Sequence, residues 1–138
     1  MSARTIPAAD KRVLAAVAAA REAGAEYRVA KREALRLFHE AECHPDMPEI
    51  CRRKDDRKKM KAVWKTVGYD AASDHRNQVY RVYKRAVKRV SELRPATLKG
   101  VTAAAELLST ADCELLENLF LETSPLKIVV ANLKRLAR

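Results

Sequence analysis

Apolar residues recur at steps of three and four along most of the chain, which is the spacing of one face of an α-helix. The most regular example is a seam of five residues: Val79, Tyr83, Ala86, Val90 and Leu93. The seam predicts a long helix of about twenty residues. We expect this helix to follow a turn over residues 68–72, to start at Ser73 or Asp74, and to end before Pro95, because Ser and Asp are good N-caps and Pro disrupts a helix.

The first half of the chain predicts two long helical segments and a short one. Residues 8–23 and 26–43 have helical apolar spacing on either side of Gly24. Whether they form one helix is left open, because a single Gly costs only about 1 kcal/mol relative to Ala. The two prolines within residues 44–48 predict a loop. Apolar spacing then resumes over residues 60–67, which predicts the short helix.

The last third of the chain predicts three short helices. The final one, over residues 126–136, is apolar on more than one side, so packing against one neighbour cannot cover it. We therefore expect residues 98–136 to contain a helical hairpin that forms a homodimer or docks on a protein partner. The alternative is that these helices fold back on the first helix and complete a monomeric bundle.

Together these segments predict an all-α fold, a compact bundle of five to seven helices. Gly and Pro number only 8 in 138 residues, which indicates a folded, strongly helical chain. We expect a basic helical domain over residues 1–94 and a neutral helical segment over residues 95–138. No apolar run in the sequence approaches the ~18 residues that a membrane span requires, so no membrane partner is predicted.

All of the surplus positive charge lies in the segment from Arg52 to Arg94, the basic block. It holds 15 Lys and Arg against 5 Asp and Glu, and basic and acidic residues are equal in number on each side of it. The formal net charge of +10 therefore belongs to this block alone. Such a pattern is typical of proteins that bind nucleic acid. The alternative is an adaptor, an inhibitor or a subunit of a larger assembly, whose basic block binds an acidic protein surface.

We expect the basic block to act by neutralising phosphates, through one group of residues around the short helix and another on the outer side of the long helix. The first group is Arg52, Arg53, Lys54, Arg57, Lys58, Lys59 and Lys61, and the second is Arg81, Lys84, Arg85, Lys88 and Arg89. At the expected start of the long helix, Arg76, Asn77 and Gln78 are candidate base contacts, because Arg can pair with guanine and Asn or Gln with adenine.

A short helix, a turn at Gly68 and a long helix that opens with polar residues resemble the general layout of helix-turn-helix DNA binders. The resemblance covers residues 56–90 and implies that the second helix reads the major groove. DNA is therefore slightly favoured over RNA, and a small regulator or a packaging factor is the kind of protein expected. Tyr80 is the residue that supports RNA as the alternative partner, because it lies off the apolar seam and could stack on an unpaired base. Packing at the edge of the core is the other interpretation of Tyr80.

Candidate chemistry beyond binding is sparse. The sequence has no nucleophile motif and no Gly-rich phosphate loop, so neither enzymatic activity nor a cofactor is expected. His39 and Cys43 share a helix face and with Cys51 could begin a zinc site, but a closely spaced cysteine pair is missing, so no metal is predicted. Three cysteines in all are too few for a disulfide framework and predict a reducing compartment, cytoplasmic or nuclear.

Overall fold

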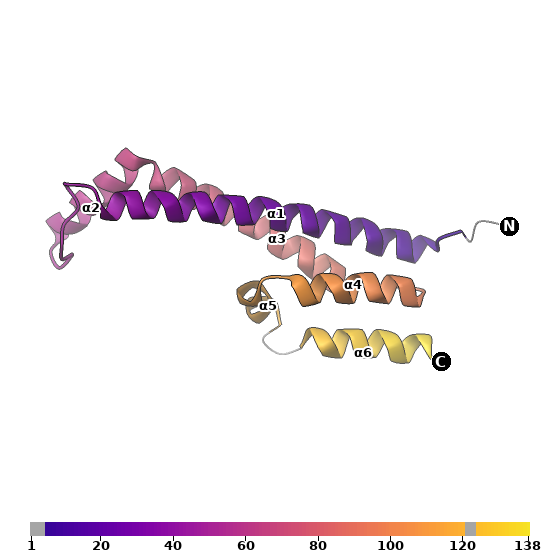
Figure 1. The fold of residues 1–138 in the computed structure, drawn as a ribbon. Coiled ribbons are helices and arrows are strands. Elements are labelled where there is room, and N and C mark those ends of the chain that lie inside the picture. Colours follow the sequence, from indigo (N-terminus) through magenta and orange to yellow (C-terminus); the bar gives the residue numbers. More distant parts are fainter. Residues whose placement is uncertain (1–4, 121–123) are drawn as a thin grey trace. The chain divides into compact units, whose positions relative to one another are not determined.

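The computed structural model describes residues 5–120 and 124–138, with every side chain but that of Cys113, and within them the only regular elements are α-helices. Figure 1 shows the six helices of these residues: α1 Ala8–Glu42, α2 Lys54–Val67, α3 Tyr69–Glu92, α4 Leu98–Thr110, α5 Cys113–Leu119 and α6 Pro125–Leu136. The predicted all-α class and the expected five to seven helices are confirmed.

The chain divides into two compact units. The central unit is Ala25–Tyr80, and the terminal unit combines Met1–Gly24 with Arg81–Arg138. Both α1 and α3 contribute residues to each unit. The terminal unit takes residues from both sides of position 95, so the division into residues 1–94 and 95–138 describes the distribution of charge, and as a division into domains it stays a prediction.

α1 is one helix of 35 residues that runs through Gly24, which answers the question of continuity. Within the terminal unit Gly24 lies against the ring of Tyr83, which is only 2% exposed. A Cβ atom at position 24 would stand 3.0 Å from Cε2 of Tyr83. The glycine therefore allows a tyrosine ring to approach the helix backbone closely, and it does not interrupt the helix.

The core of the terminal unit is built from the part of the α3 seam that follows Tyr80 and from the apolar faces of the neighbouring helices. Of the seam residues in this unit, Tyr83 and Val90 are confirmed as buried, whereas Ala86 and Leu93 are half-buried and Val87, off the seam, is fully buried. The other buried apolar side chains of this unit come from α1, α4 and α5 and include Val13, Val17, Ala20, Val101, Leu107, Leu108 and Leu115. Small side chains on α1 leave room for the larger ones of the helices beside it.

The predicted C-terminal helical hairpin is formed by α4 and α6. The two helices pack against each other and run in opposite directions, with α5 at the end where the chain turns (Figure 1). The guanidinium of Arg135 on α6 donates to the carbonyl oxygen of Pro95, just before α4. α6 contains no fully buried residue, so α4 covers only one side of it.

The central unit is held together by aromatic rings. Tyr69, the first residue of α3, packs on Phe38 of α1 and Trp64 of α2, with ring centroids 5.4 and 5.3 Å apart. Tyr27 of α1 packs on Tyr80 of α3 at 5.2 Å. Aromatic pairs at such distances add stabilisation beyond the area they bury. They fix α2 and the first turns of α3 against the second half of α1.

The start of α3 differs from the prediction. α3 begins at Tyr69, so the expected start at Ser73 or Asp74 is wrong, and Gly68 alone forms the turn. Gly68 adopts a left-handed conformation (φ 85°). Its N–H donates to the carbonyl oxygen of Lys65 at the end of α2, and its own carbonyl oxygen accepts the N–H of Ala72 in α3. A helix that starts at Tyr69 brings that ring between its two aromatic neighbours. This packing outweighs the local preference of Ser and Asp for an N-cap position.

α2 also begins earlier than its apolar spacing indicates. Residues 52–59 contain no apolar side chain, yet the helix starts at Lys54. Asp56 accepts the backbone N–H of Arg53 over 3.1 Å, which satisfies one of the free donors at the start of a helix. The result is a helix whose first six residues are all polar.

Candidate nucleic-acid interface

Four lysines form a row on α2, which we call the α2 ridge: Lys54, Lys58, Lys61 and Lys65. Their spacing of four, three and four residues places them on one side of the helix. That side is opposite Val63, the buried residue of α2, and all four lysines are exposed. At 1.5 Å per residue the ridge is about 16 Å long.

The ridge lysines have no acidic partner within the described residues, since none of their ammonium groups forms a salt bridge there. Two acids, Asp55 and Asp56, are close in sequence, but Asp56 caps the helix at Arg53. Exposed lysines without a protein partner keep their full attraction for an external anion.

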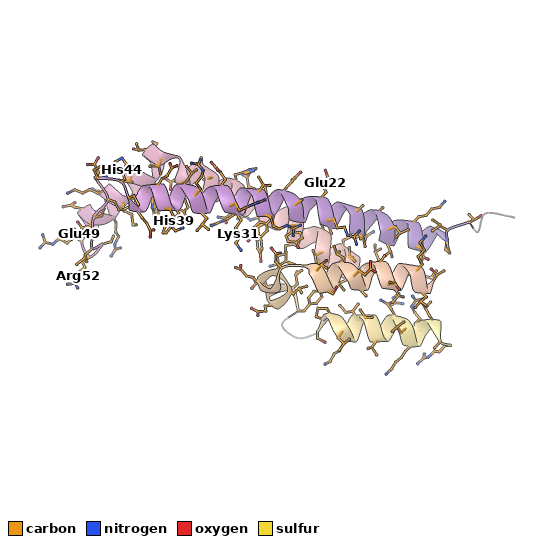
Figure 2. The ribbon with its side chains drawn as sticks, in the orientation of Figure 1. Glu22, Lys31, His39, His44, Glu49 and Arg52 are labelled. Carbon is orange, nitrogen blue, oxygen red and sulfur yellow. The ribbon has the colours of Figure 1, made fainter. Side chains whose placement is uncertain are left out.

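The remaining predicted bases of this region surround the ridge. Arg52 and Arg53 precede α2 and are exposed, and Figure 2 shows Arg52 pointing away from the ribbon. Arg57 is also exposed, one turn before Lys61. Lys59 points to the other flank of α2, where it lines a shallow cavity with His44 and Asp46. The sequence analysis named all of these residues but missed Lys65, which its distance of four residues from Lys61 could have revealed.

The terminal unit carries a second basic surface on α3, the α3 face, formed by Arg81, Arg85, Lys88 and Arg89. All four are exposed, and the three arginines follow one another at four-residue steps. Lys84 is half-buried beside them. Lys88 Nζ lies 4.0 Å from Glu92 Oε1, an exposed pair that contributes little to stability but lowers the local positive charge.

The structure does not bring Arg76, Asn77 and Gln78 to one edge of α3. Because α3 starts at Tyr69, they are its eighth to tenth residues, and their expected place in the first turns is wrong. Three consecutive helical residues are spread over about 200° of the circumference. Asn77 and Gln78 are exposed, whereas Arg76 is half-buried and its Nη2 lies 3.3 Å from Ser73 Oγ, to which it donates.

Tyr80 is half-buried, and its ring packs on Tyr27. Phe38, Trp64 and Tyr69 form further ring contacts in the central unit. These contacts occupy part of each ring surface that a nucleic-acid base would need for stacking. The arrangement therefore supports phosphate contacts better than it supports stacking on unpaired bases.

The candidate zinc ligands are not gathered into a site. His39 Nδ1 lies 3.3 Å from Glu42 Oε2, and Cys43 and Cys51 are both exposed free thiols. Across the described part of the chain, no three His, Cys, Asp or Glu side chains lie close enough together to hold a metal ion.

The chain's other global features leave the basic surfaces as the main clue to function. Within residues 5–120 and 124–138, no helix combines the length and the apolar character needed to cross a membrane. Comparisons with protein-family models, with curated proteins and with solved structures find no match. Function is therefore inferred from the side chains alone.

Proposed function

We propose that this protein binds nucleic acid through the phosphate backbone, with the α2 ridge as its main contact and the α3 face as a second. The observation that supports this proposal most directly is the row of four exposed lysines, which have no salt-bridge partner among the described residues. An ammonium group is a compact point charge that binds phosphate without reading a base. The net charge of +10, all within the basic block, supports the same partner.

The shape of the ridge favours a duplex. B-DNA carries its phosphates at a fixed, regular spacing, and four lysines held in a row of about 16 Å can contact several of them at once. A straight row fixed by a helix suits a regular array better than a flexible strand. Because the rings of the central unit pack on one another, stacking on single strands has less support. We therefore place duplex DNA ahead of RNA and single strands.

The mode of binding proposed is packaging rather than sequence reading. A helix-turn-helix regulator presents several base-reading side chains on one edge of its second helix. Arg76, Asn77 and Gln78 do not share such an edge, and Arg76 is half-buried. Phosphate contacts alone position a protein on DNA without selecting a sequence, which is what a packaging or architectural protein requires.

A salt titration tests the proposal. Affinity for labelled duplex DNA, single-stranded DNA and duplex RNA is measured by fluorescence anisotropy over a range of salt. Counterion release predicts that log affinity falls with log salt, with a slope of about −0.9 for each phosphate contacted on duplex DNA. We expect the highest affinity for duplex DNA and little dependence on its sequence.

A matched pair of double variants locates the contact. Lys58→Gln with Lys61→Gln removes the two middle lysines of the ridge and should reduce the slope by about 1.8. Lys11→Gln with Arg12→Gln removes the same charge from exposed positions on α1 and should leave the slope nearly unchanged. If the wild type binds none of the three nucleic acids at about 0.15 M salt but binds polyglutamate, the proposal is wrong and the acidic protein surface takes its place.

A further inference from the structure

α6 has an apolar side that the described protein leaves uncovered. Leu126, Val130 and Leu133 are 70%, 38% and 41% exposed. Their spacing of four and three residues places them on one side of the helix, which we call the α6 flank. Ile128, Val129 and Leu136 are half-buried on the side that packs toward α4. A row of large aliphatic side chains in water marks a docking surface more often than a solvent face.

Charge in this part of the terminal unit is segregated along the direction of α6. Residues 106–117 contain acids and no bases, and residues 127–138 contain bases and no acids. Glu114 and Glu117 are exposed on α5, which lies at the end of the hairpin where α6 begins (Figure 1). Lys134 and Arg138 are exposed at the opposite end of α6. Lys127 is also exposed in the first turn of α6, so this end of the α6 flank carries two acids beside one base, whereas the other end carries bases alone.

We propose that the α6 flank is covered by the α6 flank of a second copy of this chain, with the two helices antiparallel about a two-fold axis. This arrangement sets Leu126 against Leu133 of the partner subunit and places Val130 beside the axis. It also brings Lys134 and Arg138 to the partner subunit's Glu114 and Glu117, because an antiparallel pair joins unlike ends. A parallel pair would instead oppose like charges.

Three physical features favour a second copy over another occupant. A two-fold interface needs one patch that complements itself, and opposite charges at the two ends of an apolar row provide one. The dipoles of antiparallel helices attract each other. Residues 95–138 have no net charge, so two copies approach without overall repulsion through this segment. The inference does not depend on nucleic-acid binding.

The first test measures mass in solution by light scattering and sedimentation over a range of concentrations. The full chain should be a dimer. Val130→Glu puts two carboxylates beside the axis and should give a monomer with unchanged helicity. Val82→Glu is the matched control, because Val82 is an exposed valine of the same unit (54%) on α3, and this variant should remain a dimer.

The second test exchanges charges between copies. Variant A carries Glu114→Lys and Glu117→Lys, and variant B carries Lys134→Glu and Arg138→Glu. Each alone opposes like charges across the interface, so the dissociation constant of each homodimer should rise at least tenfold. An equimolar mixture opposes unlike charges at both ends, and we expect an A–B heterodimer with near wild-type affinity.

Mixing distinguishes contacts between copies from contacts within one copy, since intramolecular pairs would not respond to it. The inference is overturned if the wild type stays monomeric at every concentration, if Val130→Glu and Val82→Glu behave alike, or if the A–B mixture gains nothing over its components. A wild type that stays monomeric but binds anionic phosphatidylserine vesicles through Leu126 and Leu133 would overturn it in favour of a lipid surface.

Discussion

The carboxylate of Asp10 accepts the backbone N–H of Ala96 at 2.7 Å and so joins the first turn of α1 to the residues that precede α4. The hydroxyl of Thr97 donates to Asp10 Oδ2. The backbone N–H of Thr97 also donates to Asp10 Oδ1, with 3.3 Å between nitrogen and oxygen. Asp10 is only 2% exposed. In the sequence it resembles an ordinary acid at the start of a helix, whereas in the structure it links segments more than eighty residues apart.

Asp10→Ala should destabilise the terminal unit. The substitution leaves the partly buried donors of Ala96 and Thr97 without their acceptor, which costs about 1–3 kcal/mol. Urea unfolding followed by circular dichroism measures the loss. Asp70→Ala is the control, because Asp70 is an exposed acid in the first turn of α3, and we expect a change within about 0.5 kcal/mol. Equal effects of the two variants would contradict the importance of the buried link.

The same carboxylate should make stability depend on pH in the acid range. Burial alone would raise the pKa of Asp10, but the hydrogen bonds from Thr97 and Ala96, with the charge of Lys99, outweigh it and lower the pKa from its ordinary 3.8. A lowered folded-state pKa stabilises the protein at pH values above 3.8, and this contribution disappears as pH falls through the folded pKa.

Asp10→Asn provides the measurement. The difference in free energy of unfolding between wild type and variant should be constant between about pH 5 and 7 and should shrink steadily below about pH 4. A difference that grows on acidification would show that the sign is wrong.

Gly100→Ala should be destabilising although Ala favours helix by about 1 kcal/mol. A Cβ atom at position 100 would stand 2.6 Å from Asp10 Oδ1 and 2.7 Å from Pro95 Cβ, so it would push the carboxylate away from its donors. We expect a net loss of about 1–3 kcal/mol. Gly24→Ala, whose new atom would meet only the edge of the Tyr83 ring at 3.0 Å, should lose less. Thermal melts rank the two variants, and the reverse order would refute the packing argument.

Val90→Asp should unfold the terminal unit, because Val90 is 2% exposed and the new carboxylate would be buried without a partner. Val82→Asp, on the exposed side of the same helix, is the matched control and should melt cooperatively near the wild-type temperature. A folded Val90→Asp variant would mean that the seam of α3 is not core.

Local spacing predicted much of this fold, and tertiary contacts decided the rest. The burial of Val90 and Tyr83 could be predicted, because the apolar spacing that indicates it lies within one helix. The start of α3 could not, because it depends on Tyr69 packing on Phe38 of α1, which is distant in sequence, as well as on Trp64 of the preceding helix. The link between Asp10 and Ala96 is likewise invisible in either segment alone.

The candidate site shows the same limit. The lysines of α2 could be named from the sequence, since a run without apolar residues must face solvent. The half-buried position of Arg76 could not be predicted from the sequence, because a neighbouring helix, α1, produces it. Arg76 and Tyr69 of α3 line a hollow together with four residues of α1: Lys31, Ala34, Leu35 and Phe38. A neighbouring helix, and not the residue type, decides how much of that guanidinium can reach a ligand.

Glu92→Gln should strengthen DNA binding if the α3 face contacts phosphate. The carboxylate of Glu92 lies 4.0 Å from Lys88 Nζ, where it partly neutralises that lysine and repels an approaching phosphate. Its removal frees Lys88 for about one more phosphate contact, which should steepen the slope of log affinity against log salt by about 0.9.

Glu22→Gln is the control, because Glu22 is an exposed acid of the same unit on α1 and its substitution should leave the slope unchanged. Fluorescence anisotropy with duplex DNA at several salt concentrations measures both variants. If Glu92→Gln and Glu22→Gln bind DNA equally, the α3 face takes no part, and the contact belongs to the α2 ridge alone.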